Sequence, residues 1–351
     1  MPKLTVLADI HKELDAKFAP FHGWSMPLNY PGGVLAEHKH IIRYCGIIDS
    51  CCSGKFRVAG PACAENLDKV LMYKVSTLEP GRSCRNYLLA DNGCFIDAVS
   101  VLRMAEEDFF ITTSPEQALK VQQKISEKLS ADEVIQDLSE PIAQLDLTGP
   151  ESLNVLLEAE ADADQLPVPG CCGIVEIAGI RCIVNNPSTS AITSYELFCG
   201  ADNAIDLWDE LTCIEPVRPC GTGAKDALRI ENGIFAFGTE FTASTTPVDC
   251  GLYIPEYDFA GKAALAVLQN SSCCAFVKFE TKQSAHTGDK ILSTSEEEIG
   301  MVSSACVSPV FECACAICRI TQADSLKVGD KLLFLSGSNR LTGEICSFGS
   351  K

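Results

Sequence analysis

The stretch PCGTGAKDALRIE, residues 219–231, joins a glycine-rich turn to a charged helix. We expect the helix to cover residues 224–231, directly after the Gly-Thr-Gly turn. Lys225 brings a positive charge close to the helix start, where the helix dipole mildly disfavours a cation. This cost slightly favours a specific role for Lys225 over that of an ordinary surface charge.

Two further charges in this stretch are predicted to lie on one helix face. Asp226 is expected to act as an anion in the first turn, which the helix dipole favours. Arg229 follows three residues later, at a spacing that brings side chains together on a helix. Arg229 therefore has two candidate roles, a structural ion pair with Asp226 and a contact to an anionic cofactor.

The composition is that of a globular protein with two or three domains. The chain has 351 residues, of which 46% are apolar and 21% charged. Its formal net charge of −19 argues against nucleic acid or an anionic membrane surface as a partner, because phosphates would be repelled. A run of about 18 apolar residues, as a membrane-spanning helix requires, is missing from the sequence.

The chain carries 20 cysteines, scattered as adjacent pairs and as single residues in apolar stretches. Its first residues lack the features of an export signal, so we expect reduced thiols and a cytoplasmic location. Cys313, Cys315 and Cys318 are spaced like metal ligands. The segment also has the pattern of a buried strand, on which Cys318 would face away from the other two, so no metal is expected.

Helices and strands alternate irregularly along the chain, which predicts an α+β protein. Asp91-Asn92-Gly93 is a strong signal for a hairpin turn between two strands. From about Cys274 onward, short alternating segments predict an all-β end domain of about 75 residues. The expected strands are 55–59, 83–89, 95–104, 109–111, 142–147, 174–177, 181–184 and 195–198, and the expected helices are 5–17, 34–44, 62–72, 115–129, 151–160, 204–211 and 224–231.

Eight sequence blocks, in order along the chain, resemble one family. HGWSMP at residues 22–27 resembles AGWEMP, and DFAGKAAL at 258–265 resembles DFIGKEAL. The opening stretch at 219–231 resembles PxGLGARDxLRLE. The family is the aminomethyltransferase, or T-protein, family of the glycine cleavage system. The other blocks are at residues 30–33, 46–49, 51–54, 87–97 and 148–150.

The resemblance implies a three-domain cloverleaf of the T-protein type around a channel that holds tetrahydrofolate. The implied domains are a folate-binding-type α+β domain at 1–50 plus 141–230, a second α+β domain at 51–140 plus 231–273, and a C-terminal β-barrel at 274–351. The implied reaction takes an aminomethyl group from the lipoyl arm of a carrier, the H-protein. It releases ammonia and leaves methylene-tetrahydrofolate.

The same resemblance implies site residues. Glu196 matches a glutamate that accepts paired N–H bonds from the pterin ring, although the pattern alone also fits an exposed strand residue. Lys225 stands for an arginine and could neutralise the glutamyl tail of the folate, and Arg229 belongs to the same block. Tyr87 could offer its ring to a flat ligand, although a strand aromatic is more often a core residue.

Two blocks depart from the family pattern. The family has an Asp-Asp pair whose second member is catalytic, and this chain has Asp97-Ala98 there. Asp97 is therefore the candidate catalytic acid only if a bulge in the strand turns its side chain to the other face of the sheet. The family's V-S-R-T-G-Y-T-G-E loop becomes residues 184–192, with Asn186 in place of the arginine and Thr189 in place of the tyrosine. The fold thus persists where site residues have changed.

Three functions remain open from the sequence. The first is aminomethyl transfer to tetrahydrofolate. The second is a catalytically silent paralogue that binds a folate-like ligand or a partner protein. The third is a folate-dependent demethylase relative that acts on a small donor.

Overall fold

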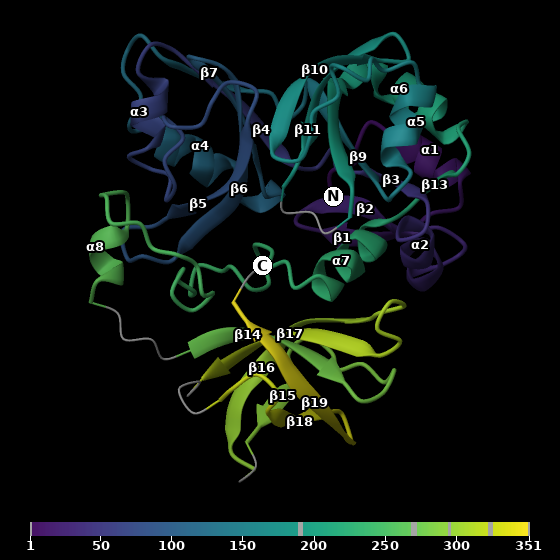
Figure 1. Ribbon diagram of the computed structural model, residues 1–351, viewed down its shortest axis with the longest axis vertical. Coiled ribbons are helices and arrows are strands. Elements are labelled where there is room, and N and C mark those ends of the chain that lie inside the picture. The colour runs from purple at the N-terminus through teal and green to yellow at the C-terminus, as the bar shows by residue number, and fades with distance from the viewer. Residues whose placement is uncertain (1, 189–191, 268–271, 294–295, 322–325, 350–351) are drawn as a thin grey trace. The chain divides into compact units, whose positions relative to one another are not determined.

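The computed structural model describes residues 2–188, 192–267, 272–293, 296–321 and 326–349. The chain forms two compact units, residues 1–88 with 98–225 and residues 89–97 with 226–351 (Figure 1). The finer division into three domains stays a prediction. Among the described residues, no helix has the length and apolarity needed to cross a bilayer.

A six-stranded sheet forms the core of the first unit. Its inner face carries alternate apolar side chains such as Tyr195 and Leu197, as the period of a strand requires. Helices α5 (Ser152–Glu158) and α6 (Ala204–Thr212) bury Leu156, Leu207 and Trp208 in the same core. The strand order is β10 (Cys171–Ile177), β11 (Ile180–Asn186), β12 (Ser194–Gly200), β9 (Ile142–Thr148), β3 (Cys45–Asp49) and β13 (Val217–Pro219).

A five-stranded sheet completes the first unit. The predicted hairpin is confirmed, because β5 and β6 are neighbours and Gly93 takes a φ of 82° in the turn. The two sheets meet where Phe110 and Phe198 pack edge to face, with ring centroids 5.0 Å apart. The strand order is β5 (Ser83–Leu89), β6 (Phe95–Ala105), β7 (Asp108–Thr113), β4 (Gly54–Ala59) and β8 (Val134–Asp137), and α3 (Cys63–Leu67) and α4 (Ala118–Ser126) belong to the same part of the chain.

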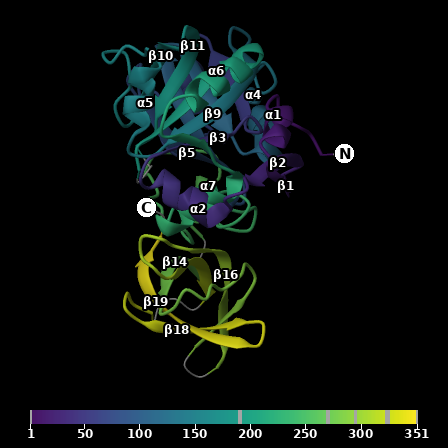
Figure 2. The ribbon, with the colours of Figure 1, turned by 90° about the vertical axis from the view of Figure 1, so that its right-hand side faces the viewer.

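The second unit contains a closed barrel, which confirms the predicted all-β end of the chain (Figures 1 and 2). Val277, Ile320, Phe334 and Ile345 fill its interior. A short helix, α8 (Lys262–Leu265), precedes the barrel. The strand order is β14 (Ser272–Phe279), β17 (Ala314–Thr321), β16 (Glu298–Val307), β15 (Lys290–Leu292), β18 (Lys331–Ser336) and β19 (Asn339–Phe348).

The opening stretch folds as predicted, into helix α7 (Thr222–Glu231), which begins two residues earlier than expected. A Cβ atom at Gly221 would overlap the backbone of Leu28, so a glycine is required there. The Gly221 N–H donates to Oε2 of Glu37 at 2.8 Å. These contacts fix the start of α7 against strand β2 (Trp24–Asn29) and helix α2 (Val34–Ile41), close to strand β1 (Lys17–Phe21).

Two of the expected helices cover only about half of their predicted length. The helix expected at 5–17 covers only Ala8–Glu13, and the helix expected at 62–72 covers only Cys63–Leu67. Asp68 explains the second difference, because its Oδ1 accepts the backbone N–H groups of Val75 at 2.6 Å and Ser76 at 3.1 Å. Side chains of this kind compete with helix continuation by holding the backbone in turns.

Buried cysteines of the first unit have raised thiol pKa values. Cys182 and Cys199 lie in the core of the first unit, and burial raises the pKa of the Cys182 thiol to about 12 and that of Cys199 to about 11. They therefore pack as small apolar groups.

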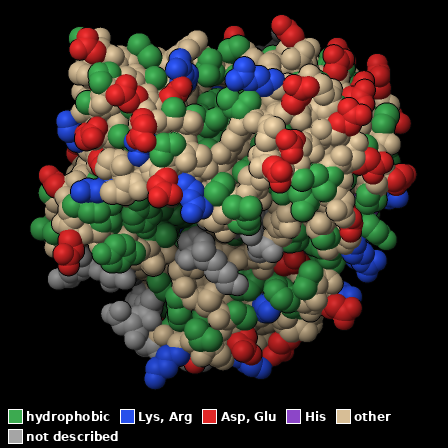
Figure 3. Space-filling model, turned by 45° about the horizontal axis from the view of Figure 1, so that its top comes forward, with side chains coloured by type: hydrophobic (Ala, Val, Ile, Leu, Met, Phe, Trp, Pro, Cys, Tyr) green, Lys and Arg blue, Asp and Glu red, His purple; other side chains and the backbone are tan. Residues whose placement is uncertain are grey.

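Acidic side chains are spread over the face seen in Figure 3, which accords with the net charge of −19.

A buried hydrogen-bond network fastens helix α1 (Ala8–Glu13) to strand β3. Oδ2 of Asp49 accepts the hydroxyl of Thr5 at 2.6 Å and lies 3.0 Å from Nε2 of His11. The hydroxyl of Tyr30 lies 2.9 Å from the other ring nitrogen of His11. Burial works to raise the pKa of Asp49, but the hydrogen bond and charge of His11 outweigh it and hold that pKa below its ordinary value.

Replacing Asp49 with Asn should destabilise the first unit by about 1–3 kcal/mol at pH 7, because it removes a buried carboxylate that accepts the Thr5 hydroxyl and contacts His11. Urea unfolding at pH 7 measures this change. The difference from the wild type should shrink as the pH falls, since protonating Asp49 removes the same charge. Asp9→Asn, in an exposed ion pair with Lys12, is the control and should leave the midpoint unchanged. Equal effects of the two variants would contradict the role of Asp49.

Candidate functional site

Three polar residues lie side by side across the six-stranded sheet. Strand pairing sets Asn185 of β11 opposite Glu196 of β12, and Glu196 opposite Asp146 of β9. Directly opposed residues project from the same face of a sheet. That face is opposite to the one that carries Tyr195 and Leu197 into the core. We call Asn185, Glu196 and Asp146 the polar row.

Hydrogen bonds connect the polar row to helix α7. Nδ2 of Asn185 donates to Oε2 of Glu196 at 2.7 Å. Oδ2 of Asp146 accepts the ammonium of Lys225 and, at 2.6 Å, the hydroxyl of Ser50. Lys225 also donates to Ser50 Oγ at 2.9 Å. The structure thus brings together Glu196 and Lys225, two residues predicted for the site, around a third that was not predicted, Asp146.

The charges of the row act on one another. Burial, followed by the nearby Asp146 carboxylate, raises the pKa of Glu196 to about 7, against the lowering effects of the Asn185 hydrogen bond and of Lys225. Burial works to lower the pKa of Lys225, but the charge and hydrogen bond of Asp146 raise it above its ordinary value. Glu196 can therefore gain or lose a proton near neutral pH, while Lys225 stays charged.

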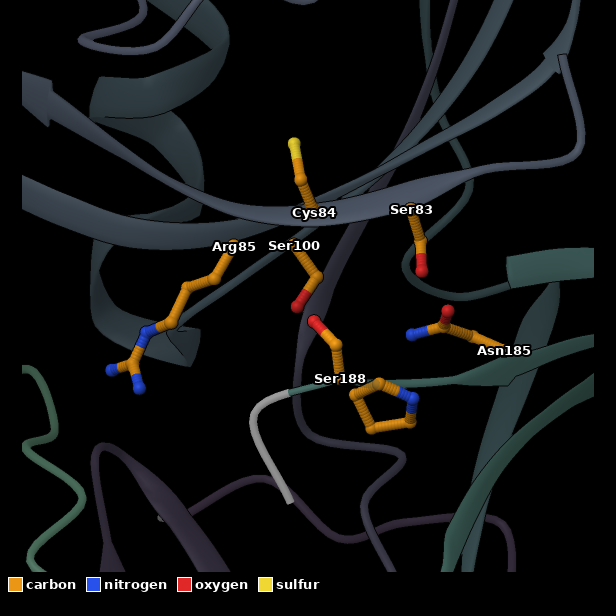
Figure 4. Close-up of a pocket in the computed structure, with 7 residues that line it drawn as sticks. Ser83, Cys84, Arg85, Ser100, Asn185 and Ser188 are labelled. Carbon is orange, nitrogen blue, oxygen red and sulfur yellow. The ribbon is translucent and has the colours of Figure 1, made fainter. Parts of the chain in front are cut away.

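A small hollow opens beside the row, where β5 and β6 approach β11. It contains about 240 Å³ of empty space, the open mouth included. Figure 4 shows the hydroxyls of Ser83, Ser100 and Ser188 and the amide of Asn185 turned toward a common space. We call this the serine hollow, and its lining residues are Ser83, Cys84, Arg85, Ser100, Asn185, Pro187 and Ser188.

Tyr87 lies further along β5, beyond Arg85. Its ring is buried, packs edge to face with Tyr73 at 5.9 Å between centroids, and lies 5.9 Å from Cζ of Arg85. Tyr87 is not among the residues that line the serine hollow. Its contact with a cofactor stays a prediction.

Asp97 and Ala98 lie on opposite faces of β6. Asp97 is fully buried, whereas Ala98 is partly exposed and shares its face with Ser100 of the serine hollow. The irregularity in the pairing of β6 with β7 lies between Arg103 and Ala105, away from this pair. The catalytic role of Asp97 stays a prediction, and the face that leads to the hollow carries a methyl group.

Arg229 belongs to the second unit. The predicted ion pair is confirmed, because Nε of Arg229 lies 2.6 Å from Oδ1 of Asp226. Its Nη1 also lies 3.0 Å from Oε2 of Glu240, and its Nη2 donates to Ser304 Oγ at 2.9 Å. The role of Arg229 toward a cofactor stays a prediction.

Asn186, one of the two replaced loop positions, is the last residue of strand β11. Asn186 is buried, and its Nδ2 donates to the carbonyl of Pro167 at 3.0 Å, so it holds the backbone on the far side of β11 from Asn185. Thr189 lies outside the described residues.

Asp146 and Asn185 are site residues that sequence reasoning missed. A signal for Asp146 exists, because strand β9, IAQLDLT, places Gln144 and Asp146 at alternate positions between apolar residues. Gln144 supports this face too, since its Nε2 donates to Oδ1 of Asp146 at 2.9 Å. Asn185 gave no such signal, since its role depends on the pairing of β11 with β12.

Comparisons with known proteins agree with this architecture. The family model of the GCVT N-terminal domain matches residues 7–255. An aminomethyltransferase of Saccharopolyspora erythraea is 28% identical over 323 residues, 88% of each chain. One of Streptomyces avermitilis is 30% identical over 278 residues, 75% of this chain and 73% of that protein. The crystal structure of glycine cleavage system aminomethyltransferase T from Bartonella henselae matches with a TM-score of 0.91 and 26% identity, over 99% of this chain and 97% of that one.

The chain therefore belongs to the GCVT family. Within that family its relatives are aminomethyltransferases, and the predicted T-protein-type α+β fold with a C-terminal barrel is confirmed.

Glu196→Gln should stabilise the protein at pH 8 and leave its stability unchanged near pH 4.5. The raised pKa means that ionising Glu196 costs more in the folded state, so the wild type loses stability as the pH rises from about 4.5 through about 7. Melting temperatures measured from pH 4.5 to 8 test this. Glu176→Gln, on an exposed position of β10, is the control. A difference that does not vary with pH would contradict the assignment.

Proposed function

We propose that the chain transfers an aminomethyl group to tetrahydrofolate, as the T-protein of a glycine cleavage system in the cytoplasm. The observation that carries the proposal is the polar row, in which a glutamate at the family's pterin-binding position has a pKa near 7. The aminomethyltransferase relatives favour this function over a silent paralogue and over a demethylase.

The residues present fit a reduced pterin. The ring carries N–H groups, and the polar row supplies the Glu196 carboxylate as their acceptor. Tetrahydrofolate supplies the nitrogen that receives the one-carbon unit. An ionised Glu196 would hold the ring by paired hydrogen bonds and fix its orientation.

The cationic groups have separate roles in this proposal. About half of the Lys225 side chain is exposed, at 49%, so its ammonium can meet an anionic folate tail while it stays bound to Asp146. Lys225 also limits the repulsion between Asp146 and Glu196, which keeps Glu196 within reach of ionisation at neutral pH. Arg229 and Tyr87 remain candidates for folate contact.

Proton transfer needs a carboxylate near the reacting nitrogen. The family's catalytic position holds Ala98, and Asp97 is buried on the other face of β6. Glu196 lies on the face that leads toward the serine hollow and would hold the ring edge that carries the paired N–H groups, so we assign it the role of orienting the reacting nitrogen on the opposite edge of the ring. The lipoyl-bearing H-protein is the proposed donor of the aminomethyl group.

Calorimetry with tetrahydrofolate, followed by an assay of methylene transfer from an aminomethylated lipoyl carrier, tests this function. We expect saturable binding together with ammonia release. Binding should strengthen between pH 6 and pH 8, because the ionised form of Glu196 is the acceptor. Binding without transfer would indicate the silent paralogue, and the absence of both would refute the proposal.

Ala98→Asp should raise the transfer rate by up to about 100-fold, because it restores a carboxylate on the hollow side of β6. Ala98→Asn has a side chain of the same size without the charge and is the matched control. Single-turnover rates of the two variants measure the effect. Equal rates for the two would show that the loop positions Asn186 and Thr189 limit the reaction instead.

A further inference from the structure

Only one end of the Asn185 amide has a hydrogen-bond partner among the described residues. Its Nδ2 donates to Glu196, while its Oδ1 is buried and has no hydrogen-bond partner among the described residues. The side chain as a whole is only 1% exposed. A buried acceptor without a partner destabilises the folded chain, and a donor from outside the chain, a water molecule or a ligand group, would satisfy this atom.

The orientation of the amide follows from Glu196. An ionised carboxylate accepts hydrogen bonds and cannot donate them, so the NH₂ end of Asn185 must face it. The oxygen end is then turned away from Glu196, to the side of Ser83 in Figure 4, and Asn185 lines the serine hollow. The charge of Glu196 thereby keeps Oδ1 available as an acceptor.

The surroundings of Asn185 suit the edge of a polar ring. The hydroxyls of Ser83, Ser100 and Ser188 can each donate or accept, and they converge on the same space as the amide (Figure 4). These groups can therefore exchange hydrogen bonds with the polar edge of a ligand.

We propose that Asn185 determines ligand specificity by accepting an N–H from the reduced pterin ring at the serine hollow, beside Glu196. This inference rests on the proposed function. The family pattern has serine at this position, whose hydroxyl is shorter and ends closer to the strand than the amide of asparagine. Asn185 thus adds a second acceptor next to the glutamate.

A double-mutant cycle distinguishes a direct contact between Asn185 and the ligand from an indirect effect of Asn185 through Glu196. The probe is 5-formyl-tetrahydrofolate, titrated by calorimetry at pH 8 into the wild type, Asn185→Leu, Glu196→Gln and the double variant. We expect Asn185→Leu to weaken binding about tenfold in the wild type and by a smaller but measurable factor in the Glu196→Gln background, because the two side chains share a hydrogen bond and Glu196 orients the amide.

Two results would overturn the inference. Unchanged binding by Asn185→Leu would show that Oδ1 does not contact the ring, and a loss that disappears in the Glu196→Gln background would show that Asn185 acts only through Glu196. A wild type that does not bind the probe fails at the earlier step and overturns the proposed function as well.

Asn154→Leu is the matched control, since it makes the same substitution at an exposed position of helix α5, away from the polar row, and should leave binding unchanged. If Asn185→Leu does not fold, Asn185→Ser serves for the same test. We expect it to bind the probe several-fold more weakly than the wild type, and equal binding would contradict the inference.

Discussion

The site depends on the ion pair between Lys225 and Asp146. Two carboxylates, Asp146 and Glu196, face each other on neighbouring strands, and like charges so placed disfavour each other's ionisation. The ammonium of Lys225 compensates the more buried of the two, with Ser50 as a shared partner. Helix α7 can supply this charge only because Gly221 lets its start approach the backbone of Leu28. The cation near the helix start, which the dipole disfavours, is thereby held by a stronger local attraction.

The remaining structure supports that arrangement. The inner face of the six-stranded sheet is filled by α5 and α6, which fixes the register and so the alignment of Asn185, Glu196 and Asp146. Strand β3 lies next to β9 in the sheet. Its residue Asp49 contacts His11 of helix α1 and so holds this helix against the sheet. A family scaffold can therefore keep its packing while individual site residues change, as Ala98 shows.

Sequence reasoning reached the parts of the molecule that depend on local patterns. The barrel, the hairpin at Gly93 and helix α7 follow from alternation, turn chemistry and a glycine-to-helix junction. Glu196 and Lys225 were predicted through the family resemblance, and both lie beside Asp146. Asp146 and Asn185 could not be predicted in the same way, because their places depend on pairing between strands that are far apart in the sequence. The helix at Cys63–Leu67 was predicted too long, because the turn held by Asp68 has no signal of its own in the sequence.

The central claim is that burial and Asp146 bring Glu196 into the neutral range of pH. A carbon-13 NMR titration of the glutamate side-chain carboxyls, with Glu196→Gln used to assign the resonance, measures this directly. The account predicts a midpoint near pH 7 in the wild type, and a higher one in Lys225→Met, where the compensating charge is removed. A midpoint near 4.5, the ordinary value of a glutamate, or one unaffected by the loss of Lys225, would contradict it.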